Sequence, residues 1–194
     1  MMNDRALIIS WIRATWLGWI IGVPMIIVLA LIGESVGIGG KQVIVGVGMG
    51  LGIGLMQSRV MRKIMEDPVP WLWSCVVGLG APFLVGDISK AIGLNLPYYL
   101  PIWIVAGGLI VGIWQSLIIG SRFRRAWLWI VANVVGWALA AGLSSIADWL
   151  PRAYGIVGIL GAAIYLGIVA AGGLVLGLVT GICLWWLMRH KAVT

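Results

Sequence analysis

Residues 50–58 read GLGIGLMQS, and residues 108–116, which follow 58 positions later, read GLIVGIWQS. The same offset places Trp71 on Trp129 without a gap. Residues 173–181 read GLVLGLVTG, so a third version follows the second at an offset of 65. The chain therefore reads as three copies of a two-helix unit, in which tryptophan-containing and glycine-rich segments alternate.

The composition indicates a lipid environment. Hydrophobic residues make up 62% of the 194 residues and charged residues only 10%, and the mean hydropathy is +1.10. Because one span needs about 20 apolar residues, six spans fit with little left over. We expect an all-α, polytopic transmembrane bundle that forms a single domain over residues 1–194. Its spans are residues 7–33, 42–62, 68–88, 101–121, 126–148 and 166–188.

The last uncharged stretch, residues 153–188, is longer than one crossing requires. As a single helix it would measure about 54 Å, against a hydrocarbon core of about 30 Å. Two crossings would place Arg189 and Lys191 on the side opposite to the other basic loops. We therefore expect only the second part of this stretch to cross.

Basic residues gather on one side of the expected spans. Three of the thirteen Lys and Arg, namely Lys41, Lys90 and Arg152, lie on the other side. The positive-inside rule then predicts that both termini are cytoplasmic. The net charge of +7 is spread over short loops, so nucleic acid is not an expected partner. The basic side carries Arg5, Arg13, Arg59, Arg62, Lys63, Arg122, Arg124, Arg125, Arg189 and Lys191.

Tryptophans cluster near the expected cytoplasmic helix ends. Trp and Tyr are enriched where a membrane meets water, so we interpret these residues as an interfacial belt rather than as a ligand-stacking surface. They are Trp11, Trp16, Trp71, Trp73, Trp127, Trp129, Trp185 and Trp186.

Small residues recur every four positions in the three glycine-rich spans, and this spacing places them on one helix face. Consecutive copies enter the membrane in the same direction, so a rotation about the membrane normal relates them and predicts a pseudo-threefold ring. We expect these faces to serve close helix packing. The alternative is a flat surface that admits an apolar ligand. The residues are Gly46, Gly50, Gly54, Gly108, Gly112, Ser116, Gly173, Gly177 and Gly181.

The pattern G-x-x-x-G-x-x-Q, followed by basic residues and a second helix with Trp, resembles repeat membrane proteins of cyanobacteria and other bacteria to which no activity is assigned. The resemblance covers spans two to five well, and spans one and six in part. Span six departs from it, because Thr180 replaces the glutamine. The resemblance implies a bacterial inner or thylakoid-type membrane and adds organisation but no chemistry.

Four polar residues within or near the spans are candidate ligand contacts: Gln57, Gln115, Asn133 and Thr180. A polar group in lipid needs a hydrogen-bond partner, and bonding between helices is the first expectation for the amides. Contact with a polar solute, or ligation of a pigment metal by an amide oxygen, is the alternative.

Glu34, Asp87 and Asp148 close the three tryptophan-containing spans on the external side. Carboxylates gathered around the axis would attract cations and form an external mouth. Solvated helix ends are the simpler interpretation. No acidic residue lies in mid-span, so the sequence shows no proton or sodium relay.

Catalytic groups are scarce in this sequence. His190 is the only histidine, so haem held by paired histidines is excluded and no metal site is expected. General acid–base or nucleophilic chemistry needs paired groups that the spans lack. We expect no enzyme, and the cofactor stays open, with a pigment, a quinone or a lipid as candidates.

These observations predict a non-catalytic integral membrane protein, a structural or accessory subunit that packs against other membrane subunits or against itself. One alternative is a small-solute or vitamin-binding transport component, similar in size to the six-span modules of vitamin importers. Another is a protein that binds a pigment, a quinone or a lipid.

Overall fold

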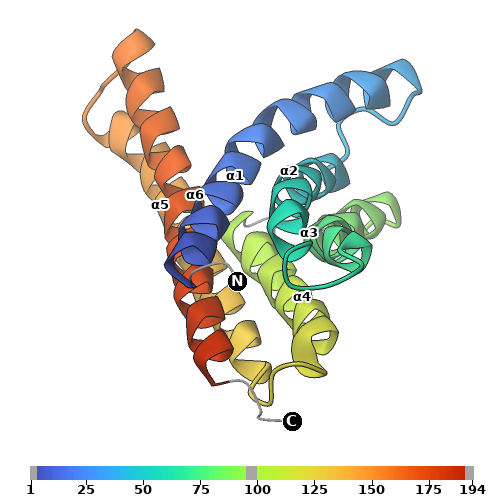
Figure 1. The fold of residues 1–194 in the computed structure, drawn as a ribbon. Coiled ribbons are helices and arrows are strands. Elements are labelled where there is room, and N and C mark those ends of the chain that lie inside the picture. The colour runs from blue at the N-terminus through green and yellow to red at the C-terminus, as the bar shows by residue number, and fades with distance from the viewer. Residues whose placement is uncertain (1–3, 95–99, 191–194) are drawn as a thin grey trace.

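Six helices make up most of the described chain, residues 4–94 and 100–190, in a computed structural model (Figure 1). All six are long and apolar enough to span a membrane. The prediction of an all-α, multi-pass integral membrane protein is confirmed. Lys191, one of the basic residues considered above, lies outside the described residues. The helices are α1 (Asp4–Ser35), α2 (Val43–Met61), α3 (Val69–Ala91), α4 (Leu100–Gly120), α5 (Trp127–Ala153) and α6 (Gly158–Arg189).

The helices form a closed ring. Each helix packs against the next one along the chain, and α6 packs against α1 to complete the circuit. Among the described residues, no other pair of helices makes comparable contact. The pairs α1–α2, α3–α4 and α5–α6 therefore follow one another around a common axis, which is the pseudo-threefold arrangement expected from the sequence.

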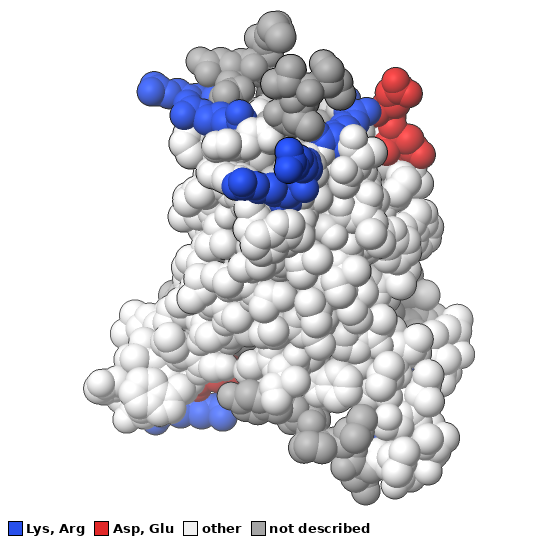
Figure 2. Space-filling model, turned by 90° about the horizontal axis from the view of Figure 1, so that it is seen from below, with Lys and Arg blue, Asp and Glu red and all other residues white. Residues whose placement is uncertain are grey.

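The two ends of the ring differ in charge. We call one the basic end; it comprises the start of α1, the connections at 62–68 and 121–126, and the end of α6. Figure 2 shows several Lys and Arg gathered at one end of the molecule, and below them a broad belt without charged side chains on the face in view. The opposite, distal end includes the connections at 36–42 and 154–157.

The longest helices extend beyond the expected spans at the distal end. Helices α1 and α6 have 32 residues each, which gives roughly 48 Å of helix. Helix α6 begins at Gly158, whose φ is +70°, and not at residue 166. Because residues 158–166 contain neither proline nor a charged side chain, nothing local stops the helix there. In Figure 1 the distal part of α1 diverges from the α5–α6 pair.

Candidate functional site

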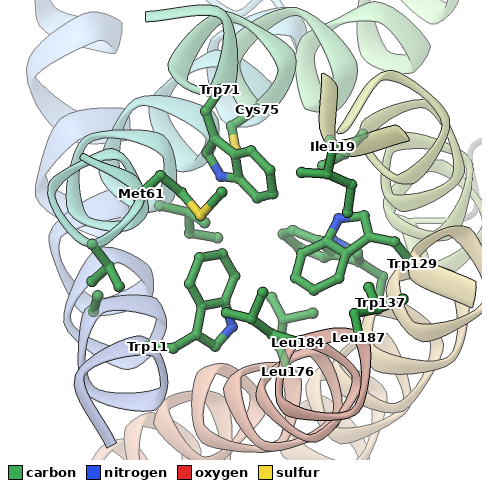
Figure 3. Close-up of a cluster of buried hydrophobic side chains, with 14 of the residues drawn as sticks. Trp11, Met61, Trp71, Cys75, Ile119, Trp129, Trp137, Leu176, Leu184 and Leu187 are labelled. Atoms are coloured by element: carbon green, nitrogen blue, oxygen red, sulfur yellow. The ribbon is translucent and has the colours of Figure 1, made fainter. Parts of the chain in front are cut away.

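Three tryptophans meet at the centre of the ring near its basic end, and we call them the tryptophan triad: Trp11, Trp71 and Trp129. They come from α1, α3 and α5, and their exposed fractions are 0%, 0% and 1%. The ring centroids lie 5.6–5.8 Å apart in edge-to-face contacts, a favourable geometry for aromatic pairs. Figure 3 shows the three side chains pointing into the middle from three sides. The triad therefore blocks the ring axis.

The prediction of an interfacial belt is wrong for these three residues. Trp71 and Trp73 are two positions apart, so they leave α3 on opposite faces. The first points to the axis and is buried, whereas Trp73 is 52% exposed. Helix α5 repeats this arrangement with a buried Trp129 and an exposed Trp127. Trp16, Trp185 and Trp186 are partly exposed near the basic end.

Each indole of the triad donates a hydrogen bond to a neighbouring glycine-rich helix. Trp71 Nε1 donates to Gln57 Oε1 at 3.1 Å, and Trp129 Nε1 donates to Gln115 Oε1 at 2.9 Å. Trp11 Nε1 donates to Thr180 Oγ1 at 2.9 Å, which closes the set between α1 and α6. An indole of one helix thus donates to a side-chain oxygen of the adjacent glycine-rich helix in all three sectors of the ring, although Trp11 precedes Trp71 by 60 residues and not by 58.

The two glutamines also bond to the helix on their other side. Gln57 Nε2 donates to Thr15 Oγ1 of α1 at 3.1 Å. Gln115 Nε2 donates to Cys75 Sγ of α3 at 3.3 Å. Each amide therefore links its own helix to both neighbours. In the described structure these amides serve contacts between helices, and both are buried.

The third sector differs because a threonine replaces the glutamine. The hydroxyl of Thr180 accepts from Trp11 and donates to the carbonyl of Leu176 at 2.7 Å within its own helix. Asn133, which occupies the position equivalent to Cys75, donates to the carbonyl of Trp129 at 3.0 Å, also within its own helix. The link between α5 and α6 at this level therefore lacks the amide bridge of the other two sectors.

The predicted glycine faces lie against the next helix in the ring. A Cβ atom on Gly50 would lie 2.5 Å from the carbonyl oxygen of Cys75 in α3, and one on Gly112 would lie 2.9 Å from Asn133 Cβ in α5. A Cβ on Gly173 would lie 2.5 Å from Trp19 Cβ in α1. The rows on α2, α4 and α6 are therefore used inside the chain, including Gly46, Gly54, Gly108, Gly177 and Gly181. Ser116 donates to the carbonyl of Ile113.

A second glycine row on α2 was not predicted as a contact. A Cβ on Gly48 would lie 2.7 Å from the backbone nitrogen of Ile26, and one on Gly18 of α1 would lie 2.7 Å from Ile53 Cα. Gly52 also faces α1, opposite Gly18 and Gly22. The signal was present in the sequence, because glycine occupies every second position from 46 to 54. Helix α2 thus approaches both neighbours closely.

A cavity lies on the ring axis on the distal side of the triad. Its floor is a second buried layer, Trp19, Leu79 and Trp137, eight residues beyond the triad on the same helices. The rings of Trp19 and Trp137 lie 5.6 Å apart at 35°. The cavity has a volume of about 150 Å³ and is lined by all six helices. Beside these three, its wall includes Val45, Gly46, Met49, Phe83, Leu100, Ile104, Ser144, Asp148, Tyr165 and Val169.

Of the three predicted external carboxylates, only Asp148 lines this axial cavity. Asp87 instead accepts the backbone N–H groups of Gln42 and Val43, at 2.9 and 2.8 Å, and so caps the start of α2. Glu34 is exposed near the end of α1. Asp148 is exposed on α5, about 16 Å beyond Trp137 at the rise of an α-helix. The axial cavity therefore has one carboxylate in its wall, on the distal side.

One buried polar group has no partner within the described structure. The indole nitrogen Nε1 of Trp19 is buried and makes no hydrogen bond there. Trp19 packs against Gly172 and Gly173 of α6, whose missing side chains make room for the indole. The triad indoles, in contrast, all have acceptors.

No metal-binding group of three or more His, Cys, Asp or Glu side chains occurs within residues 4–94 and 100–190. Cys75 and Cys183 are free thiols. Comparison with family models, with curated proteins and with solved structures gives no match to this chain. The axial cavity and the closed triad are therefore the features of the ring that bear on function.

Proposed function

We propose that this chain is a non-catalytic membrane protein that binds a small ligand in its axial cavity, entered from the distal end. One observation carries the proposal: the cavity is lined by all six helices of a closed ring, while the triad blocks the axis at the basic end. A continuous pore is incompatible with that block. A concave, mostly apolar cavity with a few polar groups is the usual form of a ligand site.

The proposed orientation places the basic end in the cytoplasm, because positively charged loops stay on that side. Helix α1 begins and α6 ends at the basic end, so both termini are then cytoplasmic. The cavity opens to the external side, in a bacterial inner or thylakoid-type membrane.

The polar side chains around the triad support a non-catalytic role. Gln57, Gln115 and Thr180 are committed to contacts with the triad. His190, at the end of α6, stacks on Trp186 with centroids 4.2 Å apart, at the end of the ring opposite to Asp148. Acid–base chemistry needs groups within hydrogen-bond reach of a common substrate.

An accessory subunit is the alternative interpretation. In that interpretation the glycine faces pack either inside the chain or against a partner, and in the structure neighbouring helices of the chain occupy them. The remaining support for an accessory subunit is the large apolar outer surface, which membrane lipid can cover equally well.

The proposed function is tested with a pair of adjacent serines. Ser144 lines the axial cavity, whereas Ser145 lines only other hollows, and both hydroxyls donate to carbonyls of their own helix. Ser144→Phe should fill the cavity and Ser145→Phe should not. We expect the wild type and Ser145→Phe to retain small molecules through purification, and Ser144→Phe to lose them. Mass spectrometry of the purified proteins identifies the retained molecules.

Equal content of retained molecules in the three proteins would contradict ligand binding in the cavity. A membrane subunit that co-purifies in equal amounts with all three proteins would then favour the accessory role.

A further inference from the structure

We infer that the axial cavity selects a small organic cation that carries an alkylammonium group, an inference that rests on the binding function proposed above. The features that point to this chemistry are the aromatic side chains of the wall, the single carboxylate and the small volume.

Aromatic side chains reach the cavity from four different helices. Trp19 comes from α1, Phe83 from α3, Trp137 from α5 and Tyr165 from α6. A cation near the face of an aromatic ring is attracted by the ring quadrupole, and ammonium ligands are commonly held by several rings at once. The attraction grows when water is excluded, as it is beside Trp19 and Trp137, which are 4% and 3% exposed.

The charge of the wall has the sign that a cation requires. Among the described residues that line the axial cavity, Asp148 is the only charged one. No Lys, Arg or His lines it within the described residues, although the chain carries a net charge of +7. An anion would meet the carboxylate without any compensating cation, whereas an ammonium group would be attracted to it.

The volume restricts the ligand to a small group. A protein cavity of about 150 Å³ accommodates a molecule of the size of benzene, well below the 300–1,000 Å³ common for drug-sized ligands. The axial cavity has about this volume. A compact methylated or primary ammonium head fits this limit, and a polyamine or a large dye does not.

Arg152 is the basic residue in the last turn of α5. It lies four residues after Asp148 and lines an adjoining hollow that also contains Asp148, Ser144 and Leu100. Residues four apart share a helix face and interact when their charges are opposite. A cationic ligand would compete with Arg152 for the attraction of Asp148, so we expect that removal of the guanidinium strengthens binding.

Two sources supply the same alkylammonium chemistry, namely a free solute and the headgroup of a phospholipid. Both enter from the distal side, where Asp148 and Tyr165 are exposed. The test separates them by offering the solute in a maltoside detergent without ammonium groups, and the lipid in nanodiscs of phosphatidylglycerol with or without phosphatidylcholine.

The probes are choline and its neutral isostere 3,3-dimethyl-1-butanol, with binding measured by calorimetry and by the shift in melting temperature. We expect choline to bind in detergent, or phosphatidylcholine to stabilise the protein in nanodiscs, and the isostere to bind at least tenfold more weakly. Asp148→Asn should weaken binding of the cation at least tenfold, Arg152→Gln should strengthen it, and Glu34→Gln should leave it unchanged.

The outcomes separate the two proposals. If the isostere binds as well as choline and Asp148→Asn has no effect, the cation inference is wrong while the cavity remains a binding site. If neither probe nor lipid binds, and Ser144→Phe also retains the same small molecules as the wild type, both proposals fail. Because Asp148 is exposed, Asp148→Asn should fold, and its melting temperature without ligand checks this directly.

Discussion

The contact between Trp129 and Gln115 gives the sharpest test of how this ring is held together. The indole nitrogen donates to the amide oxygen at 2.9 Å, and both side chains are 1% exposed. Gln115→Leu keeps a side chain of similar size but removes the acceptor. The buried N–H of Trp129 is then left without a partner, because the site excludes water.

The expected cost follows from the desolvation of that donor. A buried donor without an acceptor costs about 1–3 kcal/mol, and hydrogen bonds between helices in membranes average about 0.6 kcal/mol with a maximum near 1.7. The second contact of the amide, to Cys75 Sγ at 3.3 Å, is weak because sulfur is a poor acceptor. We therefore expect Gln115→Leu to lower the free energy of unfolding by about 1–2 kcal/mol.

A double-mutant cycle isolates the hydrogen bond from changes in packing. Trp129→Phe removes the donor, and the double variant removes both partners. The double variant should therefore lose less free energy of unfolding than the sum of the two single variants, by about 1 kcal/mol. Unfolding in mixed maltoside and dodecyl sulfate micelles, followed by far-ultraviolet circular dichroism, measures each value. Trp127→Phe is the control, since Trp127 is exposed and substitutions of exposed residues usually alter the free energy of unfolding by no more than about 0.5 kcal/mol. A coupling energy of zero, with Gln115→Leu as stable as the wild type, would refute this account of the ring.

Three further results are expected. Thr180→Val, which keeps the side-chain shape but removes the hydroxyl that accepts an indole N–H, should destabilise by about 1–2 kcal/mol in the same micelle assay, whereas Thr180→Ser should cost less than half of that. Gly112→Leu should cost about 1–3 kcal/mol from overpacking, while Gly142→Leu should be near neutral because nothing lies within 4 Å of a Cβ there; equal melting temperatures would contradict close packing. In cells, a cysteine in place of Tyr154 should react with an impermeant maleimide, and one in place of Arg124 should react only after permeabilisation; the reverse pattern would invert the proposed orientation.

The spans and the glycine faces are accessible from the sequence because they depend on local patterns. Apolar runs bounded by charged loops set the number of helices, and a spacing of four residues defines a helix face whatever lies opposite. Gly50 and Gly112 were predicted as packing residues on that basis alone, and the structure places both against a neighbouring helix.

The triad was missed because composition does not determine how a helix is rotated about its own axis. Trp71 and Trp73 are both near a helix end, and both suit an interface, yet only the first faces the ring axis. The available signal was the match of Trp71 with Trp129 at the same offset that aligns Gln57 with Gln115. In both copies the indole donor follows the amide acceptor by 14 residues. Such a repeated spacing indicates that the two side chains form a hydrogen-bonded pair.

The axial cavity was not predictable, since its wall combines residues from all six helices. The three external carboxylates looked alike in the sequence because each follows an apolar span. Their roles differ because of their neighbours: Asp87 faces the first N–H groups of α2, whereas Asp148 faces the axis. Only the placement of the helices around the ring separates a cap from a cavity wall.

The threefold pattern is followed more closely at the basic end than at the distal end, and this difference separates scaffold from site. Near the triad, equivalent positions carry buried side chains that pack in the core, as in the layer of Met61, Ile119 and Leu184. Near the cavity the copies diverge: Asp148 stands 58 residues after Lys90, so equivalent positions carry opposite charges. A symmetric ring needs equal contacts for closure, whereas a ligand with one charged group needs a single carboxylate on one side. The three copies therefore have similar side chains where the helices pack against each other, and different side chains where the proposed ligand binds.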